Sequence, residues 1–224
     1  MPRIYLTALK PTDSVTHGFL PAARAIGCAV TILTDRPDQH PDAVGCAVTD
    51  PRALIDTIAA LGRPDAIFSN SDHLQTETAL AAEYFGLPGK DWRACLRAKN
   101  KYLMREHLSA TGVEQVRAVR LAPHDPPPEH LPYPVVLKPR EGVASEDVML
   151  VESGLPAAIA TVRARRPGAA LVVEEYLPGP LHTLETLTAR CSAVSAPPWA
   201  RSRTSSRNAS TGVPRTRPSM SAPP

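Results

Sequence analysis

The sequence predicts an α/β fold whose N-terminal part is built on a parallel sheet. Over roughly the first 85 residues, short runs rich in Val, Ile and Leu alternate with segments of helical spacing, and Pro, Gly or Asp stands at most of their ends. Strands that alternate with helices at this spacing form βαβ units and a parallel sheet. The 224 residues, 43% of them hydrophobic, are enough to bury a sizeable core.

This first half is expected to contain four strands and three helices. The expected strands are residues 4–9, 29–34, 46–48 and 66–69, and the expected helices are residues 18–26, 51–61 and 74–85. The second helix has a proline in its first turn and Gly62 at its end, which is typical of helix termini.

Two loops of this half are candidate ligand-binding rims. Residues 10–17 follow the first expected strand and residues 69–72 follow the fourth. Ligands of open α/β sheets bind outside the carboxyl ends of the strands. The alternative for Asp72 is that it caps the helix 74–85, with Gln75 completing a capping box.

The second half mixes helices with strands that lack the βαβ alternation. The expected elements are a short helical turn at 92–97, an amphipathic helix at 101–110 that ends at Thr111 and Gly112, a strand at 115–121, a proline-rich connector at 123–134, a helix at 155–165, and strands at 170–176 and 181–187.

Residues 134–152 predict a β-hairpin with an unusually long connection. The apolar residues 135–137 lead into Lys138, a polar loop with one glycine follows at 140–146, and residues 148–151 are apolar again. A lysine beside such a loop can bind polyphosphate, because backbone N–H groups surround the oxygens and the ammonium supplies a compact charge. The alternative is an ordinary surface hairpin with a solvated lysine.

The charge distribution indicates neither a nucleic-acid nor a membrane partner. The chain has 25 basic and 22 acidic residues, a net charge of +3, but six of the basic residues are arginines that follow Glu185, where no acid occurs. The other 19 basic residues leave residues 1–185 with a net charge of −3. No run of 18 apolar residues and no signal-peptide core is present, so a cytoplasmic protein is expected.

Cysteine and histidine spacing does not predict a metal centre. The four cysteines form no C-x-x-C pair, and the seven histidines show neither H-x-H nor H-E-x-x-H spacing. Inert, reduced thiols are therefore expected rather than a zinc site.

The order of the parts in the second half resembles the ATP-grasp superfamily, and specifically its carboxylate–amine ligases (the L-amino-acid ligase and biotin-carboxylase-like group). That order is a helix opened by Lys101, a strand lysine with its loop, an acid-tipped strand, and Glu185 on the next strand. The resemblance spans about residues 3–187. It implies a Rossmann-like pre-ATP-grasp domain at 1–90 and a partial ATP-grasp domain at 91–187, with a small lid at about 114–177.

The resemblance also implies a nucleotide-binding set: Lys101, Lys138, Gly142, Ser145, Glu174, Glu175, Tyr176, Leu177 and Glu185. The two lysines would contact the phosphates of ATP, and the loop 142–145 would cover them. In the hinge 174–177, a carboxylate and a carbonyl would accept from the adenine amino group and the Leu177 amide would donate to the ring. Glu185 would line the site, while Leu181 stands where many relatives have a glutamate for the ribose.

Simpler alternatives exist for two parts of this set. Lys101, with Lys99, is also compatible with a solvated helix start, and Glu174 with Glu175 is compatible with a solvated strand end.

The resemblance implies a reaction that joins a small carboxylic or amino acid to an amine, with ATP and Mg²⁺ as cofactors. Transfer of the γ-phosphoryl group makes an acyl phosphate, and the amine then expels phosphate. Such transfer needs positioning and charge neutralisation more than a nucleophile, and no Ser-His-Asp or Cys-His pairing is evident. The alternatives are a non-catalytic nucleotide-binding module and a biotin-carboxylase-like enzyme; the sequence is compatible with an oligomer.

Residues 188–224 have the composition of a disordered tail. They contain eight serines, six arginines and six prolines without apolar periodicity. We interpret these residues as a shifted reading frame rather than an evolved extension, because another frame can encode strand-like sequence with acidic residues, and a genuine disordered tail is the alternative. Because no Asp or Glu follows Glu185, the acidic Mg²⁺ ligands that the superfamily carries on later strands are expected to be absent, and an impaired ligase is expected.

Overall fold

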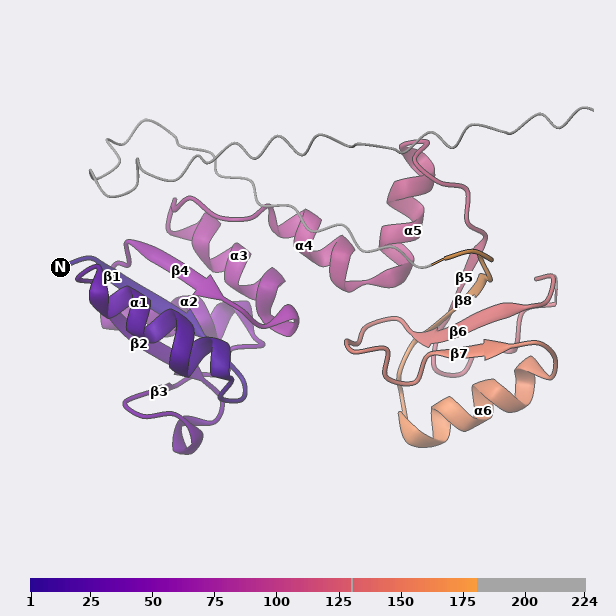
Figure 1. Ribbon diagram of the computed structural model, residues 1–224, viewed down its shortest axis with the longest axis horizontal. Coiled ribbons are helices and arrows are strands. Elements are labelled where there is room, and N and C mark those ends of the chain that lie inside the picture. Colours follow the sequence, from indigo (N-terminus) through magenta and orange to yellow (C-terminus); the bar gives the residue numbers. More distant parts are fainter. Residues whose placement is uncertain (130, 181–224) are drawn as a thin grey trace, which may run out of the picture. The chain divides into compact units, whose positions relative to one another are not determined.

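Two four-stranded sheets organise the described part of the chain, which is residues 1–129 and 131–180 of the computed structural model (Figure 1). The strand order is β3-β2-β1-β4 in the first sheet and β5-β8-β6-β7 in the second. Both sheets fall within one unit, Met1–Pro178. No helix among the described residues is long and apolar enough to cross a membrane.

The first sheet is parallel throughout, which confirms the prediction. Its strands are β1 (Arg3–Thr7), β2 (Ala29–Thr34), β3 (Val44–Gly45) and β4 (Ala66–Ser69). The central strand β1 pairs in parallel with both β2 and β4. Parallel neighbours need long crossovers, and the helices between them supply these connections.

Three α-helices accompany this sheet: α1 (Leu20–Ala25), α2 (Pro51–Leu61) and α3 (Gln75–Tyr84). Three shorter helical turns also occur: the π-helical η1 (Ser14–Phe19) and the 3₁₀ turns η2 (Pro37–Gln39) and η3 (Asp72–Leu74). Fully buried side chains from β2, α2 and η3, including Leu33, Leu54, Ile58 and Leu74, form one core cluster. Asp50 caps α2 by accepting from the Arg52 amide.

Two local predictions for this half are wrong. The third strand is Val44–Gly45 rather than 46–48, because the chain turns after Cys46 to bring Asp50 to the start of α2. Asp72 does not cap α3, since the turn η3 precedes that helix and no side chain caps either element. Gln75 instead donates its amide hydrogens to the carbonyls of Ser69 and Ser71.

The second sheet is antiparallel throughout and has β8 in its middle. Its strands are β5 (Ala118–Leu121), β6 (Val135–Pro139), β7 (Met149–Val151) and β8 (Leu171–Glu175). β8 pairs with β5 on one side and β6 on the other. The β6–β7 pairing confirms the predicted hairpin. The helix α6 (Leu155–Arg165) packs its buried Ile159 and Val162 with Leu137 and Leu171 of the sheet.

Asn100 separates the helices α4 (Trp92–Lys99) and α5 (Lys101–Ala110). Its backbone is extended, and its side-chain oxygen accepts from the amides of Tyr102 and Leu103. This N-cap makes Lys101 the first residue of α5. At the other end Gly112 has a positive φ of 72°, and the Val113 amide donates to the Leu108 carbonyl, so the predicted end of the helix is confirmed.

Two domain-level predictions are not tested by these elements. The expected boundary at residue 90 and the lid at about 114–177 stay predictions. The expected strand 181–187 and the tail 188–224 lie outside the described residues.

We expect Asn100→Ala to lower the free energy of unfolding by about 1 kcal/mol, because two amides at the start of α5 lose their acceptor. Urea unfolding followed by circular dichroism measures the change. Asn100→Asp keeps an accepting oxygen and serves as the matched control. Equal destabilisation by both substitutions would show that the cap is not what Asn100 contributes.

Candidate functional site

Lys138 and Glu174 meet across the second sheet. In the antiparallel register Lys138 of β6 lies opposite Val172 of β8, so Glu174, two residues on, is its diagonal neighbour on the same face. The Lys138 ammonium forms an ion pair with Oε1 of Glu174. The two side chains are only 11% and 6% exposed. Neither a solvated hairpin lysine nor a solvated strand end therefore describes these two residues.

Arg105 of α5 holds the same carboxylate. Its Nε lies 3.0 Å from Oε2 of Glu174, and one terminal nitrogen lies 3.3 Å from Oε1. The other terminal nitrogen donates to Glu114. Burial by itself would raise the pKa of Glu174, but hydrogen bonds from Arg105 and Lys138 together outweigh it and hold that pKa below its ordinary value. Glu174 is thus a buried, ionised carboxylate at neutral pH.

Lys101 is tied to the beginning of the loop that follows β6. Its Nζ donates to the Gly142 carbonyl at 2.9 Å, and its backbone amide donates to the Arg140 carbonyl at 3.0 Å. Burial lowers the pKa of Lys101, and the positive charge of Lys138 lowers it further. The alternative of a solvated helix start is therefore wrong for Lys101, although its partner is a carbonyl rather than an acid.

The loop between β6 and β7 is anchored at its far end by arginines. Arg166 binds Asp147 and also Glu146, the latter at 2.8 Å, while Arg165 lies 3.1 Å from Asp147. The hydrogen bond from Arg166 lowers the pKa of Asp147.

Backbone conformation sets this loop apart from an ordinary hairpin turn. Ala144, Ser145 and Asp147 all have positive φ angles, of 53°, 55° and 56°. Residues with a Cβ adopt this region rarely, and such conformations gather at ligand-binding segments. Residues 142–147 are therefore held in an unusual shape between the Lys101 and Arg166 anchors.

A cavity of about 270 Å³ lies between this loop and the sheet. Lys101, Lys138, Gly142 and Ser145, four of the residues predicted from the sequence, line it together. Two ammonium groups facing a stretch of loop backbone are a donor set that fits the oxygens of a polyphosphate.

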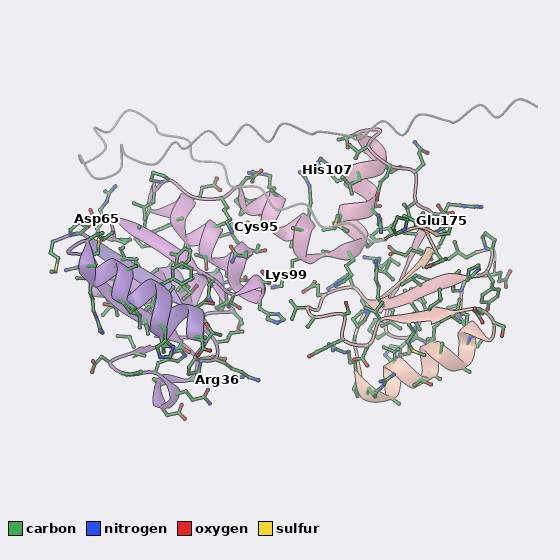
Figure 2. The ribbon with its side chains drawn as sticks, in the orientation of Figure 1. Arg36, Asp65, Cys95, Lys99, His107 and Glu175 are labelled. Carbon is green, nitrogen blue, oxygen red and sulfur yellow. The ribbon has the colours of Figure 1, made fainter. Side chains whose placement is uncertain are left out.

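The predicted hinge follows directly at the end of β8. Glu175, labelled in Figure 2, accepts from Arg117 Nε at 3.1 Å. The Tyr176 amide donates to the Pro134 carbonyl at 3.2 Å, which fixes the chain beside β6. Tyr176 is 40% exposed and Leu177 is 54% exposed. Since Glu174 and Glu175 both already bind arginines, the hinge presents mainly its backbone and these two side chains.

The two candidate rims of the parallel sheet lie next to each other. Asn70, after β4, donates to Thr12, after β1, at 3.2 Å. A cavity near the end of β4 is lined by residues that include Asp72, Gln75 and Lys90. Lys99 of α4, labelled in Figure 2, is not free there, because it binds Glu77 at 3.3 Å and the His73 carbonyl at 2.9 Å.

Sequence reasoning missed Arg105. It stands four residues after Lys101, so both side chains lie on the same face of α5, and that spacing was the signal that could have found it.

Glu185 and Leu181 lie outside the described residues. Within the described residues no three His, Cys, Asp or Glu side chains converge to hold a metal ion.

Comparison with known proteins gives one curated relative. No family model matches the chain. Over 193 residues the chain is 28% identical to the ATP-grasp enzyme fsqD of Aspergillus fumigatus, which covers 76% of this chain. The chain spans 32% of the length of that relative.

Solved structures give the same fold. An L-amino acid ligase from Bacillus licheniformis matches 80% of this chain and 45% of its own, with a TM-score of 0.62 and 21% identity. An N5-carboxyaminoimidazole synthetase from Staphylococcus aureus, solved with ADP, matches 79% of this chain and 48% of its own, with a TM-score of 0.55 and 16% identity. The predicted fold class is confirmed, since a parallel sheet precedes an antiparallel one and 80% of the chain matches the fold of the amino acid ligase structure.

The charge of Glu174 predicts a pH dependence of stability. Because its pKa in the folded chain is below the ordinary value of 4.5, the unfolded chain takes up a proton at higher pH. Its contribution is therefore present above that ordinary pKa and is lost as the pH falls through the folded pKa. We expect Glu174→Gln to flatten the acid-side fall of the unfolding free energy, measured by urea titrations between about pH 6 and about pH 3. An unchanged slope would contradict an ionised Glu174 in the fold.

Proposed function

From its likeness in sequence and fold to the ATP-grasp carboxylate–amine ligases, we propose that this chain binds ATP and activates a small carboxylic or amino acid for attack by an amine. One observation of the structure supports the proposal above all. Lys101 and Lys138 come from different elements yet line one cavity together with the loop 142–145.

The two lysines would neutralise the charge of the phosphates. Phosphoryl transfer requires the protein mainly to position the groups and to stabilise negative charge on the phosphate oxygens. Lys101 enters from the N-terminus of α5, whose backbone dipole also favours an anion. The loop 142–145 would cover the phosphates with its backbone N–H groups.

The adenine would bind at the hinge 174–177. Because Arg105 and Arg117 already bind the carboxylates of Glu174 and Glu175, we assign adenine recognition there to the backbone, including the Leu177 amide. The exposed side chains of Tyr176 and Leu177 would contact the ring. Glu174 then serves the site through Lys138 rather than through the adenine amino group.

The acid substrate would bind at the carboxyl ends of the parallel strands. There the cavity lined by Asp72, Gln75 and Lys90 offers both an acid and a cation, which suits an amino acid with its two opposite charges. One of the matched structures is named for L-amino acid ligation.

The reaction would proceed in two transfers. An oxygen of the acid attacks the γ-phosphorus, ADP leaves, and an acyl phosphate forms. The amine nitrogen then attacks the acyl carbon, phosphate leaves, and the amine gives up its proton. Mg²⁺, when bound to ATP, would supply further charge neutralisation.

We expect Lys138→Ala and Lys101→Ala each to weaken ADP and ATP binding by about 10-fold or more, because each removes a charge-assisted contact to phosphate. Isothermal titration calorimetry measures both affinities. Arg24→Ala, which removes one positive charge from the exposed surface of α1, is the control and should bind as the unmodified chain does. Unaltered binding in the lysine variants would refute the assigned phosphate site.

We expect phosphate release from ATP to require both an acid and an amine when pairs of amino acids are supplied. A coupled phosphate assay on the full chain with Mg²⁺ measures this. Binding of ATP without release for any pair would indicate a non-catalytic nucleotide-binding module. Release that requires bicarbonate but no added amine would indicate a biotin-carboxylase-like enzyme.

A further inference from the structure

We propose that Arg105 is a positioning residue that makes Lys138 available to the nucleotide by holding the Glu174 carboxylate. This inference rests on the proposed function, because it concerns how the phosphate-binding lysine becomes free. Arg105 itself lines no part of the cavity between the loop and the sheet.

Lys138 already has a strong anionic partner. Its ammonium is paired with Oε1 of Glu174, and both side chains are almost fully buried. A phosphate oxygen can take that ammonium only by competing with the carboxylate. Lys138 is therefore useful to a nucleotide only if Glu174 has another cation to which its charge can turn.

Arg105 has the geometry to be that cation. Oε2 of Glu174 is bound by Arg105 Nε, while Oε1 is shared between Arg105 and Lys138. When Lys138 turns toward a phosphate, the two guanidinium contacts remain. A planar guanidinium can bind both oxygens of a carboxylate at once, which an ammonium cannot do.

Burial makes this second cation necessary. A carboxylate that is only 6% exposed cannot be compensated by water if its cation leaves, and an unpaired buried charge is costly. Glu114 binds the far side of the Arg105 guanidinium and thereby fixes its orientation toward Glu174. Without Arg105, a phosphate would have to displace a carboxylate that has no cation other than Lys138 among the described residues.

The position of Arg105 links the two phosphate-binding lysines. One turn of α5 separates it from Lys101, so the same helix face supplies Lys101 to the loop and Arg105 to Glu174. A single helix thus sets the surroundings of both ammonium groups.

Binding of ADP and of adenosine by Arg105→Met tests the proposal. ADP affinity, measured by isothermal titration calorimetry, should fall about 30-fold, since phosphate must then displace an otherwise unpaired carboxylate. Adenosine carries no phosphate, so its affinity should stay within about twofold of that of the unmodified chain. Arg105→Lys keeps the charge but not the two-point contact, so its ADP affinity should lie between that of Arg105→Met and that of the unmodified chain. Equal loss of ADP and adenosine affinity would mean that Arg105 only maintains the fold, and would overturn the proposal.

A double variant tests whether Arg105 acts on ADP binding through the charge of Glu174. In Arg105→Met/Glu174→Gln no carboxylate competes for Lys138, so ADP affinity should recover to within about threefold of the unmodified chain. Failure to recover would overturn the proposal. Arg163→Met, which removes a partly buried arginine of α6 that donates to the carbonyls of Ala122 and Asp125, is the control and should leave ADP affinity unchanged.

The same series distinguishes this inference from the function on which it rests. If the unmodified chain binds ADP and Lys138→Ala does not, the nucleotide site stands whatever Arg105→Met shows. If the unmodified chain binds neither ADP nor ATP, the proposed function fails and this inference fails with it.

Discussion

The organisation of the second sheet depends on one buried carboxylate. Glu174 lies near the end of β8, the strand that has β5 on one side and β6 on the other, and its side chain is only 6% exposed. A charge in that position must be matched by cations. β6 supplies Lys138 and α5 supplies Arg105. The cations that pair with this one carboxylate therefore link β8 to both β6 and α5. Glu114 extends the arrangement to the segment after α5.

Stability alone gives little reason for such a network. A buried ion pair recovers in Coulombic attraction about what its members lose in solvation, and apolar residues of similar size often stabilise a fold as well. The three preceding positions of β8, residues 171–173, are apolar and fully buried, so an apolar residue would suit position 174 as far as packing is concerned. The retention of three charged groups beside a cavity with a second lysine therefore favours a role in binding an anion.

How far the sequence predicted the structure differs from feature to feature. α2, α5, α6, β2 and β4 begin and end where local signals put them, because Pro, Gly and capping side chains act within a few residues. The supposed cap at Asp72 was wrong because an extra 3₁₀ turn displaced the start of α3. The partners of Glu174 were missed for another reason. Arg105 and Glu174 are 69 residues apart in the sequence, and no periodicity encodes which buried charges meet across a sheet.

The two phosphate-binding candidates illustrate why the partner of a lysine matters as much as the lysine. Each ammonium already has an acceptor within the chain: the neutral Gly142 carbonyl for Lys101 and the Glu174 carboxylate for Lys138. At the proposed site, nucleotide affinity would then depend on how much more strongly each ammonium binds a phosphate than its present acceptor. Exchanging a carbonyl for a phosphate is favourable, because a hydrogen bond to an ionised acceptor is roughly twice as strong. Exchanging a carboxylate for a phosphate is unfavourable unless the carboxylate keeps another cation as its partner. For the proposed phosphate site, that asymmetry predicts a need for a second cation beside Lys138 but not beside Lys101.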